Sequence, residues 1–255
     1  MKPIYIELRR TARRIAACQP APDFYHDFSL SVGRSRRLFQ DDPLVRRLRE
    51  IVRVETRDNM GHGLAHAKTV ALDAGTITAI ETGQADFGEP ESRHAIRMAH
   101  CAGLLHDIRR RQPDHAEKGA AAAREILSKE ENLAPVDVER IAFAIAHHEA
   151  FKEYQPPRSI EGRILAGSLY DADKFRWGPD NFTDTVWDML AASPIPPAPE
   201  KFARLYPRAM AYIARIKTTF RTPVGRQYGP QFIDIGLDIG DRLWNHLREQ
   251  IPETE

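Results

Sequence analysis

The sequence predicts an all-α fold, and two patterns lead to that prediction. Apolar residues recur at the three- and four-residue spacing of amphipathic helices, whereas the strict alternation that is typical of half-buried strands is scarce. Helix-starting residues also precede several of these segments. The clearest is Asp42-Pro43, where an aspartate at the N-cap is followed by a proline at the first helical position. We therefore expect a helical bundle with additional helices toward both ends of the chain.

The predicted helices follow one another along the chain with short connections. The first clear one begins at Asp42-Pro43 and continues to about Arg57, and Asn59 to Gly63 is predicted to form a turn. The next helix carries His66, Val70 and Ala71. The remaining helices are expected at about Ser92 to His106, His115 to Leu127, Pro135 to about Glu149, Ile160 to about Asp173, Glu200 to Phe220 and Pro230 to Glu249. The segment 92–106 leaves little polar face, so it should be central and buried.

Three connections are informative. Gly83 to Pro90, rich in glycine and acidic residues, is predicted to be a loop, and the proline-rich segment Ser193 to Pro199 a stiff connector. Arg221 to Pro230 contains glycines, arginines and a tyrosine. We interpret it as a helix connection in preference to a loop that closes over a substrate.

Composition and charge limit the class of protein. With 42% hydrophobic and 29% charged residues, the chain resembles a soluble globular protein. The 37 basic and 36 acidic residues nearly balance, which argues against a dedicated nucleic-acid binder. A local basic pocket for a small phosphorylated molecule remains compatible with this balance.

The sequence also predicts a cytoplasmic location. Four arginines between residues 9 and 14 interrupt any signal-peptide apolar core, and no stretch approaches the ~20 apolar residues of a membrane span. Cys18 and Cys101 lack metal-binding or disulfide-framework spacing. We expect them to be free, buried thiols in a reducing compartment.

The candidate chemistry centres on His106-Asp107 at the end of the central apolar helix. A buried imidazole beside a buried carboxylate needs partners to offset desolvation, and a divalent cation satisfies both groups. Imidazole combined with carboxylate suits Mn, Fe, Co, Ni or Zn, with Mg as a further candidate. Other possible ligands lie near predicted helix ends: His66, His115, His147, His148, Asp171 and Asp173.

The order His66, His106-Asp107, Asp173 resembles the HD superfamily of metal-dependent phosphohydrolases. The local contexts are also similar: residues 61–66 before Val70, residues 102–108 around the HD pair, and residues 171–175 at the last acid. The resemblance covers about residues 57–176. It implies an HD-like metal-binding core there, with His66, His106, Asp107 and Asp173 as ligands. Asp173 is preferred to Asp171 because the family's ligand is the acid that follows the alanine.

Two further segments resemble family members that have additional histidines. They are His115-Ala116-Glu117-Lys118-Gly119-Ala120 and Ala144-Ile145-Ala146-His147-His148. In such members the extra histidines bind a second metal or face the substrate, so one or two ions are expected here. His148 is the better match and His147 the weaker, since neighbours on a helix point about 100° apart. No GYP segment follows Glu149, which makes cyclic-di-GMP an unexpected substrate.

The resemblance implies a metal-dependent phosphohydrolase that acts on a nucleotide or another small phosphate ester through a metal-activated water. Asp107, His115 and Lys118 are the candidate catalytic residues. Lys118, Lys174 and Arg109 are the candidate phosphate contacts. Two alternatives remain open: a di-iron HD-type oxygenase and a non-catalytic ligand-sensing module. We expect residues 1–255 to form a single helical domain, with a C-terminal helical extension at about 199–251.

Overall fold

The computed structural model describes residues 2–56 and 63–250, and in these residues every regular element is a helix. The all-α prediction is therefore confirmed. The elements are α1 (Pro3–Ala17), α2 (Asp23–Asp27), α3 (Ser29–Asp41), α4 (Pro43–Glu55), α5 (Leu64–Gln84), α6 (Glu89–Leu105), α7 (His115–Leu127), α8 (Pro135–Ala146), α9 (Ile160–Phe175), the π-helix η1 (Asn181–Thr185), α10 (Val186–Ala192), α11 (Pro199–Ala214), the 3₁₀ helix η2 (Arg215–Thr218) and α12 (Pro223–Gln250).

Most helix starts agree with the local signals. The Asp42 carboxylate accepts hydrogen bonds from the backbone N–H groups of Leu44 and Val45, at 2.9 and 3.1 Å, and so caps α4 as predicted. The helices α7, α8 and α9 begin at the predicted residues. Most of the predicted turn at residues 59–63, namely residues 59–62, lies outside the described residues.

The start of α12 differs from the prediction. The helix begins at Pro223, so most of the segment 221–230 is helical and does not form a connection. The Thr222 hydroxyl accepts a hydrogen bond from the Gly225 N–H at 2.8 Å, which makes Thr222-Pro223 a capped start like Asp42-Pro43. Pro230 lies inside the helix.

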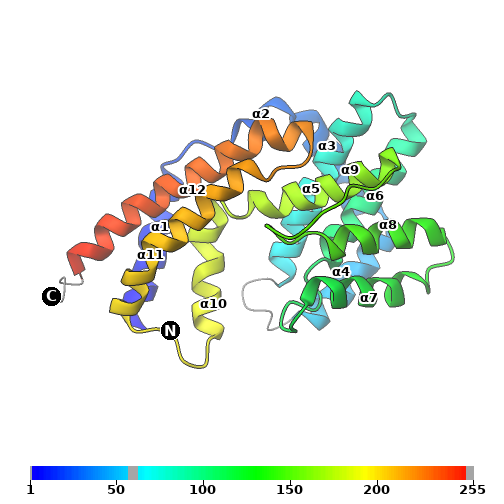
Figure 1. Cartoon of the computed structure of the whole chain (residues 1–255). Coiled ribbons are helices and arrows are strands. Elements are labelled where there is room, and N and C mark those ends of the chain that lie inside the picture. The colour runs from blue at the N-terminus through cyan, green and yellow to red at the C-terminus, as the bar shows by residue number, and fades with distance from the viewer. Residues whose placement is uncertain (1, 57–62, 251–255) are drawn as a thin grey trace.

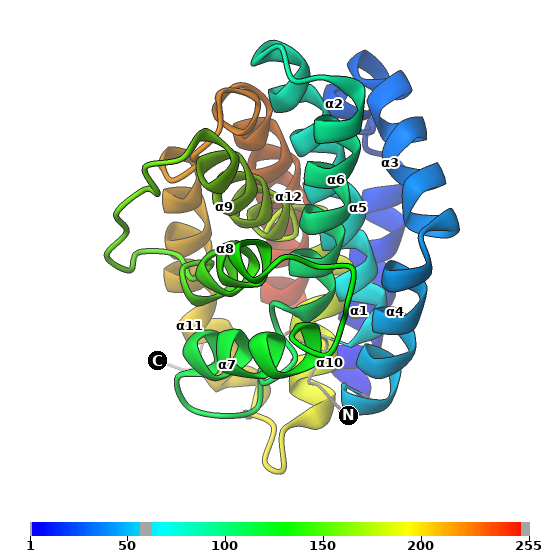
Figure 2. The same cartoon turned by 90° about the vertical axis from the view of Figure 1, so that its right-hand side faces the viewer.

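Two antiparallel helices, α5 and α6, form the centre of the molecule. Helices α3 and α4 pack on one side of this pair and α8 and α9 on the other, with α7 against α8 (Figure 2). Gly103 marks a close approach, because a Cβ atom there would lie 2.4 Å from the Cα of Ala71. From Met98 to Leu105 every residue of α6 is buried, as predicted for the central helix. The start of α5 and the end of α6 therefore lie together.

The two ends of the described chain share a second group of helices. α1 packs against α12, η1 and α10, and α11 packs along α12 (Figure 1). The start of α12 is tied to α9: Asp171 accepts hydrogen bonds from the backbone N–H groups of Arg221 and Thr222, both at 2.8 Å. A Cβ atom on Gly225 would lie 2.0 Å from a carboxylate oxygen of Asp171, so this contact requires glycine. The C-terminal helices are thus attached to the helix that carries Asp173.

The two cysteines differ in burial. Cys101 is buried, as predicted, but the prediction for Cys18 is wrong: this thiol is exposed, because α1 has ended one residue before it. Both thiols are free. In the described parts of the chain, no helix combines the length and the apolar character that crossing a membrane requires.

A buried histidine gives the fold a predictable response to acid. The His100 side chain is fully buried on α6, and its Nε2 lies 2.9 Å from the Ser35 hydroxyl. Ser35 donates its own hydrogen to the Leu72 carbonyl, so its oxygen accepts from His100. Burial lowers the pKa of His100 to about 3.

We predict that His100 makes the free energy of unfolding depend on pH. Its folded pKa is depressed, so protonation favours the unfolded chain, whose histidine titrates near pH 6.5. The contribution is complete above about pH 6.5 and is lost as the pH falls toward 3, by at most about 1.4 kcal/mol per pH unit. Urea unfolding at pH 7.5 and pH 5 should therefore show a smaller loss for His100→Gln. His26→Gln, at a largely exposed histidine, serves as the control. Equal losses in wild type and His100→Gln would contradict this account.

Candidate metal centre

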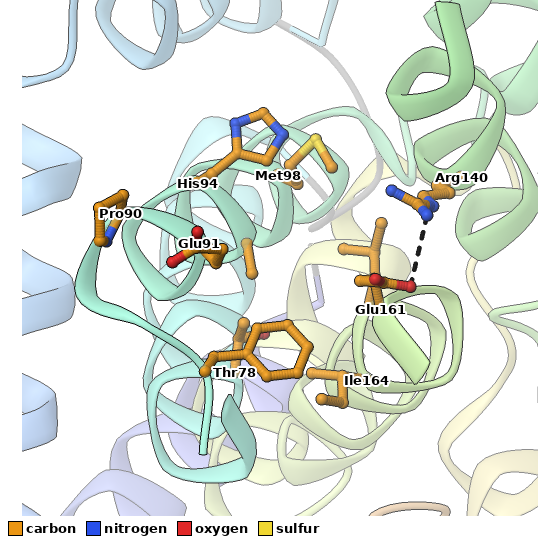
Figure 3. A pocket seen from close by; sticks show the side chains of 11 residues that line it. Thr78, Pro90, Glu91, His94, Met98, Arg140, Glu161 and Ile164 are labelled. Atoms are coloured by element: carbon orange, nitrogen blue, oxygen red, sulfur yellow. Dashed lines mark hydrogen bonds and ion pairs between the residues drawn. The ribbon is translucent and has the colours of Figure 1, made fainter. Parts of the chain in front are cut away.

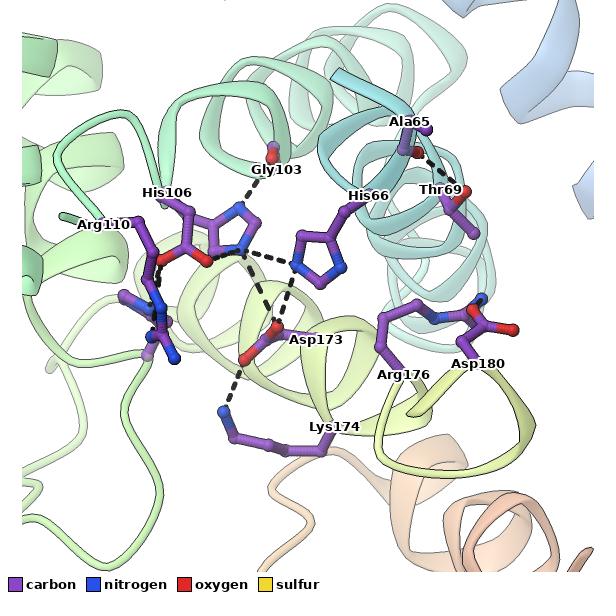
Figure 4. A network of polar contacts seen from close by, with 12 residues as sticks. Ala65, His66, Thr69, Gly103, His106, Arg110, Asp173, Lys174, Arg176 and Asp180 are labelled. Atoms are coloured by element: carbon purple, nitrogen blue, oxygen red, sulfur yellow. Dashed lines mark hydrogen bonds and ion pairs between the residues drawn. The ribbon is translucent and has the colours of Figure 1, made fainter. Parts of the chain in front are cut away.

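Three side chains, from α5, the end of α6 and α9, meet where α5 begins and α6 ends. His66 Nε2 lies 3.3 Å from His106 Nε2 and 3.5 Å from Asp173 Oδ1 (Figure 4). His106 Nε2 lies 3.7 Å from the same oxygen of Asp173. The helix α9 supplies Asp173 from its last turn. Residues far apart in the sequence thus place one nitrogen or oxygen each around a common centre.

The ring of His106 is held in one orientation. Its Nδ1 lies 2.8 Å from the Gly103 carbonyl and donates to it, which leaves the lone pair of Nε2 directed at the cluster. The side chain is fully buried, and this burial lowers the pKa of His106 to about 4. The imidazole is therefore neutral near pH 7, the form that can ligate a metal.

Asp107 lies between two sets of histidines. One carboxylate oxygen, Oδ2, is 3.5 Å from His106 Nε2. The other, Oδ1, is 3.5 Å from His148 Nε2 and 3.6 Å from His115 Nε2. His148 donates from Nδ1 to the Ile145 carbonyl at 2.6 Å, so its Nε2 also faces the cluster. The carboxylate of Asp107 has the geometry of a bridge between the two sets.

Both carboxylates are ionised despite their burial. Burial acts to raise the pKa of Asp107, but His106 and His148 outweigh it and hold this pKa well below its usual range. The pKa of Asp173 is likewise held well below its usual range, although burial acts to raise it. The charge of Lys174 contributes most to this lowering and the hydrogen bond with His66 next. Lys174 Nζ lies 2.5 Å from Asp173 Oδ2, the oxygen that does not face the histidines.

These residues fit a divalent ion. The described residues contain two groups whose ligand atoms all lie within 4.8 Å of one another: His66, His106 and Asp173, and His106, Asp107 and His148. Ligand atoms at about 2.0–2.2 Å from one ion are separated by roughly 3 Å, so the observed separations need only a small contraction. Ionised carboxylates and a neutral imidazole at His106 are also the protonation states that metal binding requires. Nitrogen and carboxylate oxygen together favour a transition metal over calcium.

The structure does not bring His147 to this cluster. Its ring stacks on Phe143, with the ring centroids 4.1 Å apart, and its Nδ1 lies 2.9 Å from the Phe143 carbonyl. The two adjacent rings therefore differ in position: His148 Nε2 faces Asp107, whereas His147 contacts Phe143. Because α8 ends at Ala146, the two histidines leave its last turn in different directions.

Two of the predicted phosphate contacts are placed elsewhere. Lys118 is exposed, because α7 buries Ala116, Gly119 and Ala120 and so turns Lys118 to the solvent. Arg109 forms an ion pair with Glu55 at 2.7 Å and does not line the cavity at the cluster. His115 is the first residue of α7, so the three-residue spacing from His115 does not predict which way the Lys118 side chain points.

A cavity of about 280 Å³ opens over the cluster, and its wall contains cations that the sequence did not single out. Arg110 is one of them: its Nη1 lies 2.9 Å from His115 Nε2 and 3.8 Å from Asp107 Oδ1. Arg110 follows Asp107 by three residues and is the middle one of three consecutive arginines. The sequence alone does not indicate which of the three faces the cavity, because the conformation of the turn after α6 decides it. Lys174, a candidate phosphate contact, lines the same cavity.

Arg176 also reaches the cavity, but its charge is already paired. Its guanidinium lies 2.6 Å from Asp73. It also lies 2.5 Å from Asp180, beside it in Figure 4. The far wall of the cavity comes from residues beyond α9, including Trp177, Asn181, Thr185, Met189 and Tyr212. The C-terminal helices thus complete the space above the cluster.

The comparisons with known proteins agree with this geometry. Residues 63–176 match the family model of the HD domain, a family that binds divalent metals and whose members are commonly phosphohydrolases. Neither the curated proteins nor the solved structures gave a match. The matched range begins just before α5, ends just after α9 and contains every residue of the cluster. Residues 63–176 therefore match the HD-domain family, the family that the order of the histidines and aspartates predicted.

Proposed function

We propose that this protein is a metal-dependent phosphohydrolase that acts on a small phosphate ester. The observation that carries the proposal is the position of His106 Nε2, which has the ligand atoms of His66, Asp107 and Asp173 at 3.3–3.7 Å. A cavity with two inward cations lies directly over these atoms. Negatively charged oxygens of a substrate would meet the positive side chains and the metal site together.

His66, His106, Asp107 and Asp173 would hold the first ion. A divalent ion bound there lowers the pKa of a coordinated water and polarises a phosphoryl oxygen. Asp107 also reaches His148 and His115 through its other oxygen, so these three residues are the candidates for holding a second ion. His115 Nε2 is in hydrogen-bonding distance of Arg110, which supports the alternative role in which both face the substrate.

The chain's own cations would bind and orient the ester. Arg110 presents a planar guanidinium that matches two oxygens of a phosphate group. The hydrogen bond between Arg110 and His115 holds this guanidinium at the cavity wall. Lys174 is confined by Asp173 and lies 5.0 Å from the centre of the Tyr170 ring. Its ammonium thus lies beside the ligand cluster, where it would be a second positive group for the phosphate.

The organic part of the substrate would lie against the C-terminal helices. Trp177 and Tyr212 offer aromatic surface, whereas Asn181 and Thr185 offer hydrogen-bonding groups on the same wall. The π-helix η1 contains both Asn181 and Thr185, and such helices are frequent at functional sites. A nucleotide is one ester that combines a phosphate with a flat, hydrogen-bonding group.

We predict that Asp107→Ala removes both metal and activity. Loss of the shared carboxylate should lower bound metal and reduce phosphate release by about 100-fold or more, while the helical content stays unchanged. The measurement is a phosphate-release screen over small esters with Mn, Co, Ni or Mg, combined with elemental analysis and circular dichroism. Asp241→Ala, at an exposed aspartate of α12, is the matched control. Full phosphatase activity in Asp107→Ala would contradict the proposal, as would bound iron with dioxygen uptake and no phosphate release.

The adjacent histidines of α8 provide a second prediction. His148→Ala should lower the number of ions bound per chain or weaken their binding by about 10- to 100-fold, since His148 Nε2 faces Asp107. His147→Ala should leave metal binding unchanged, because its ring stacks on Phe143. Metal titration of the two variants tests the difference. Equal losses in both would show that the two rings are not separated as described.

A third prediction concerns phosphate recognition. Arg110→Gln should raise KM or lower kcat/KM by about tenfold or more, the usual effect of losing a charge-assisted hydrogen bond. Lys118→Gln should leave both constants nearly unchanged, because Lys118 faces the solvent. Steady-state kinetics on the best ester from the screen compares the two. A larger effect at Lys118 than at Arg110 would reverse the assignment.

A further inference from the structure

A second cavity, of about 360 Å³, lies between α5, α6, α8 and α9, away from the metal centre (Figure 3). The lining residues of α6 run from Pro90 to Met98 and those of α9 from Glu161 to Leu165. By contrast, His106 follows the end of α6 and Asp173 lies near the end of α9. The two cavities have no lining residue in common. Its volume falls within the usual range for small-molecule sites, roughly 300–1,000 Å³.

Most of the lining is apolar. The side chains of Phe87, Ala95, Met98, Ile164 and Leu165 contribute to it. The lining favours a ligand with a large apolar surface.

One lining residue, Thr78, is a buried polar group without a partner. Its side chain is fully buried, and its hydroxyl has no hydrogen-bond partner among the described residues. Other threonines of α5 behave differently: Thr76 donates to the Leu72 carbonyl and Thr82 to the Thr78 carbonyl, both at 2.8 Å. Buried hydroxyls are normally hydrogen-bonded, and a ligand with one polar group would satisfy Thr78.

The charges at the rim indicate which ligands are excluded. Arg140 forms ion pairs with Asp137 at 3.2 Å and with Glu161 at 3.3 Å (Figure 3). Its charge is therefore already neutralised. His94 Nδ1 lies 3.1 Å from Arg97 Nη2 and accepts from it, so His94 Nε2 donates to Asp137. Glu91 adds another carboxylate to the lining. The rim therefore disfavours an anionic ligand.

We propose that this cavity binds a neutral, largely apolar small molecule that carries one hydrogen-bonding group, and that Thr78 is the partner of that group. The apolar walls would supply most of the binding energy and the hydroxyl would orient the ligand. The proposal is independent of the phosphohydrolase function, because no residue of the metal centre contributes to this cavity.

The test uses three probes that share one ring system: naphthalene, 2-naphthol and 2-naphthoate. Equilibrium binding to the full chain, followed by the fluorescence of each probe, should rank 2-naphthol first and 2-naphthoate last. Thr78→Val keeps the shape of the side chain but removes its hydroxyl. It should weaken the binding of 2-naphthol by roughly two- to twelvefold and leave that of naphthalene nearly unchanged.

Three further variants complete the experiment. Ala95→Phe should weaken both uncharged probes about tenfold by filling the space. Thr69→Val, the same substitution at another residue of α5, should have no effect, and Asp107→Ala should retain 2-naphthol binding. Circular dichroism and thermal unfolding verify that each variant is folded. Failure of both uncharged probes to bind would overturn the proposal, and so would equal affinity of 2-naphthol for wild type and Thr78→Val.

Discussion

The close packing of α5 against α6 is the constraint on which the site depends. Gly103 lies against Ala71, and a side chain there would separate the two helices. This approach brings His66, at the start of one helix, to 3.3 Å from His106, just beyond the end of the other. The same glycine supplies the carbonyl that orients the His106 ring. One residue thus sets both the spacing of the helices and the direction of the central nitrogen.

The site also holds several buried titratable side chains, the histidines and aspartates of the cluster, within a few ångströms of one another. Burial keeps His106 neutral, while neighbouring positive charges and hydrogen bonds keep Asp107 and Asp173 ionised. The arrangement would be costly if these groups had no cation between them. A divalent ion would satisfy several of them at once, so the folding of α5, α6 and α9 brings together groups that could hold one. Lys174 and Arg110 then add positive charge on the open side.

Much of this could be predicted because the relevant signals are local. Asp42-Pro43 indicated a helix start, and the apolar residues before His106 indicated the central helix. The order of histidines and aspartates indicated the family whose model residues 63–176 match. What the sequence could not supply was the direction of side chains at helix ends. The spacing from His115 predicts that Lys118 faces the site, but the packing of α7 turns it to the solvent. Arg110 has no local feature that distinguishes it from Arg109 and Arg111. Thr222-Pro223 was a usable signal for α12, hidden by the stronger expectation that Pro230 begins that helix.

The most direct test of the central claim is a crystal structure of the protein grown with Mn²⁺, with the ion located by its anomalous scattering. The account predicts an ion bonded to His66 Nε2, His106 Nε2 and carboxylate oxygens of Asp107 and Asp173, at about 2.0–2.3 Å. A further ion between His115 and His148, also bonded to Asp107, would show that the centre is binuclear. An anomalous peak that lies away from these four residues, or no peak at saturating Mn²⁺, would contradict the account.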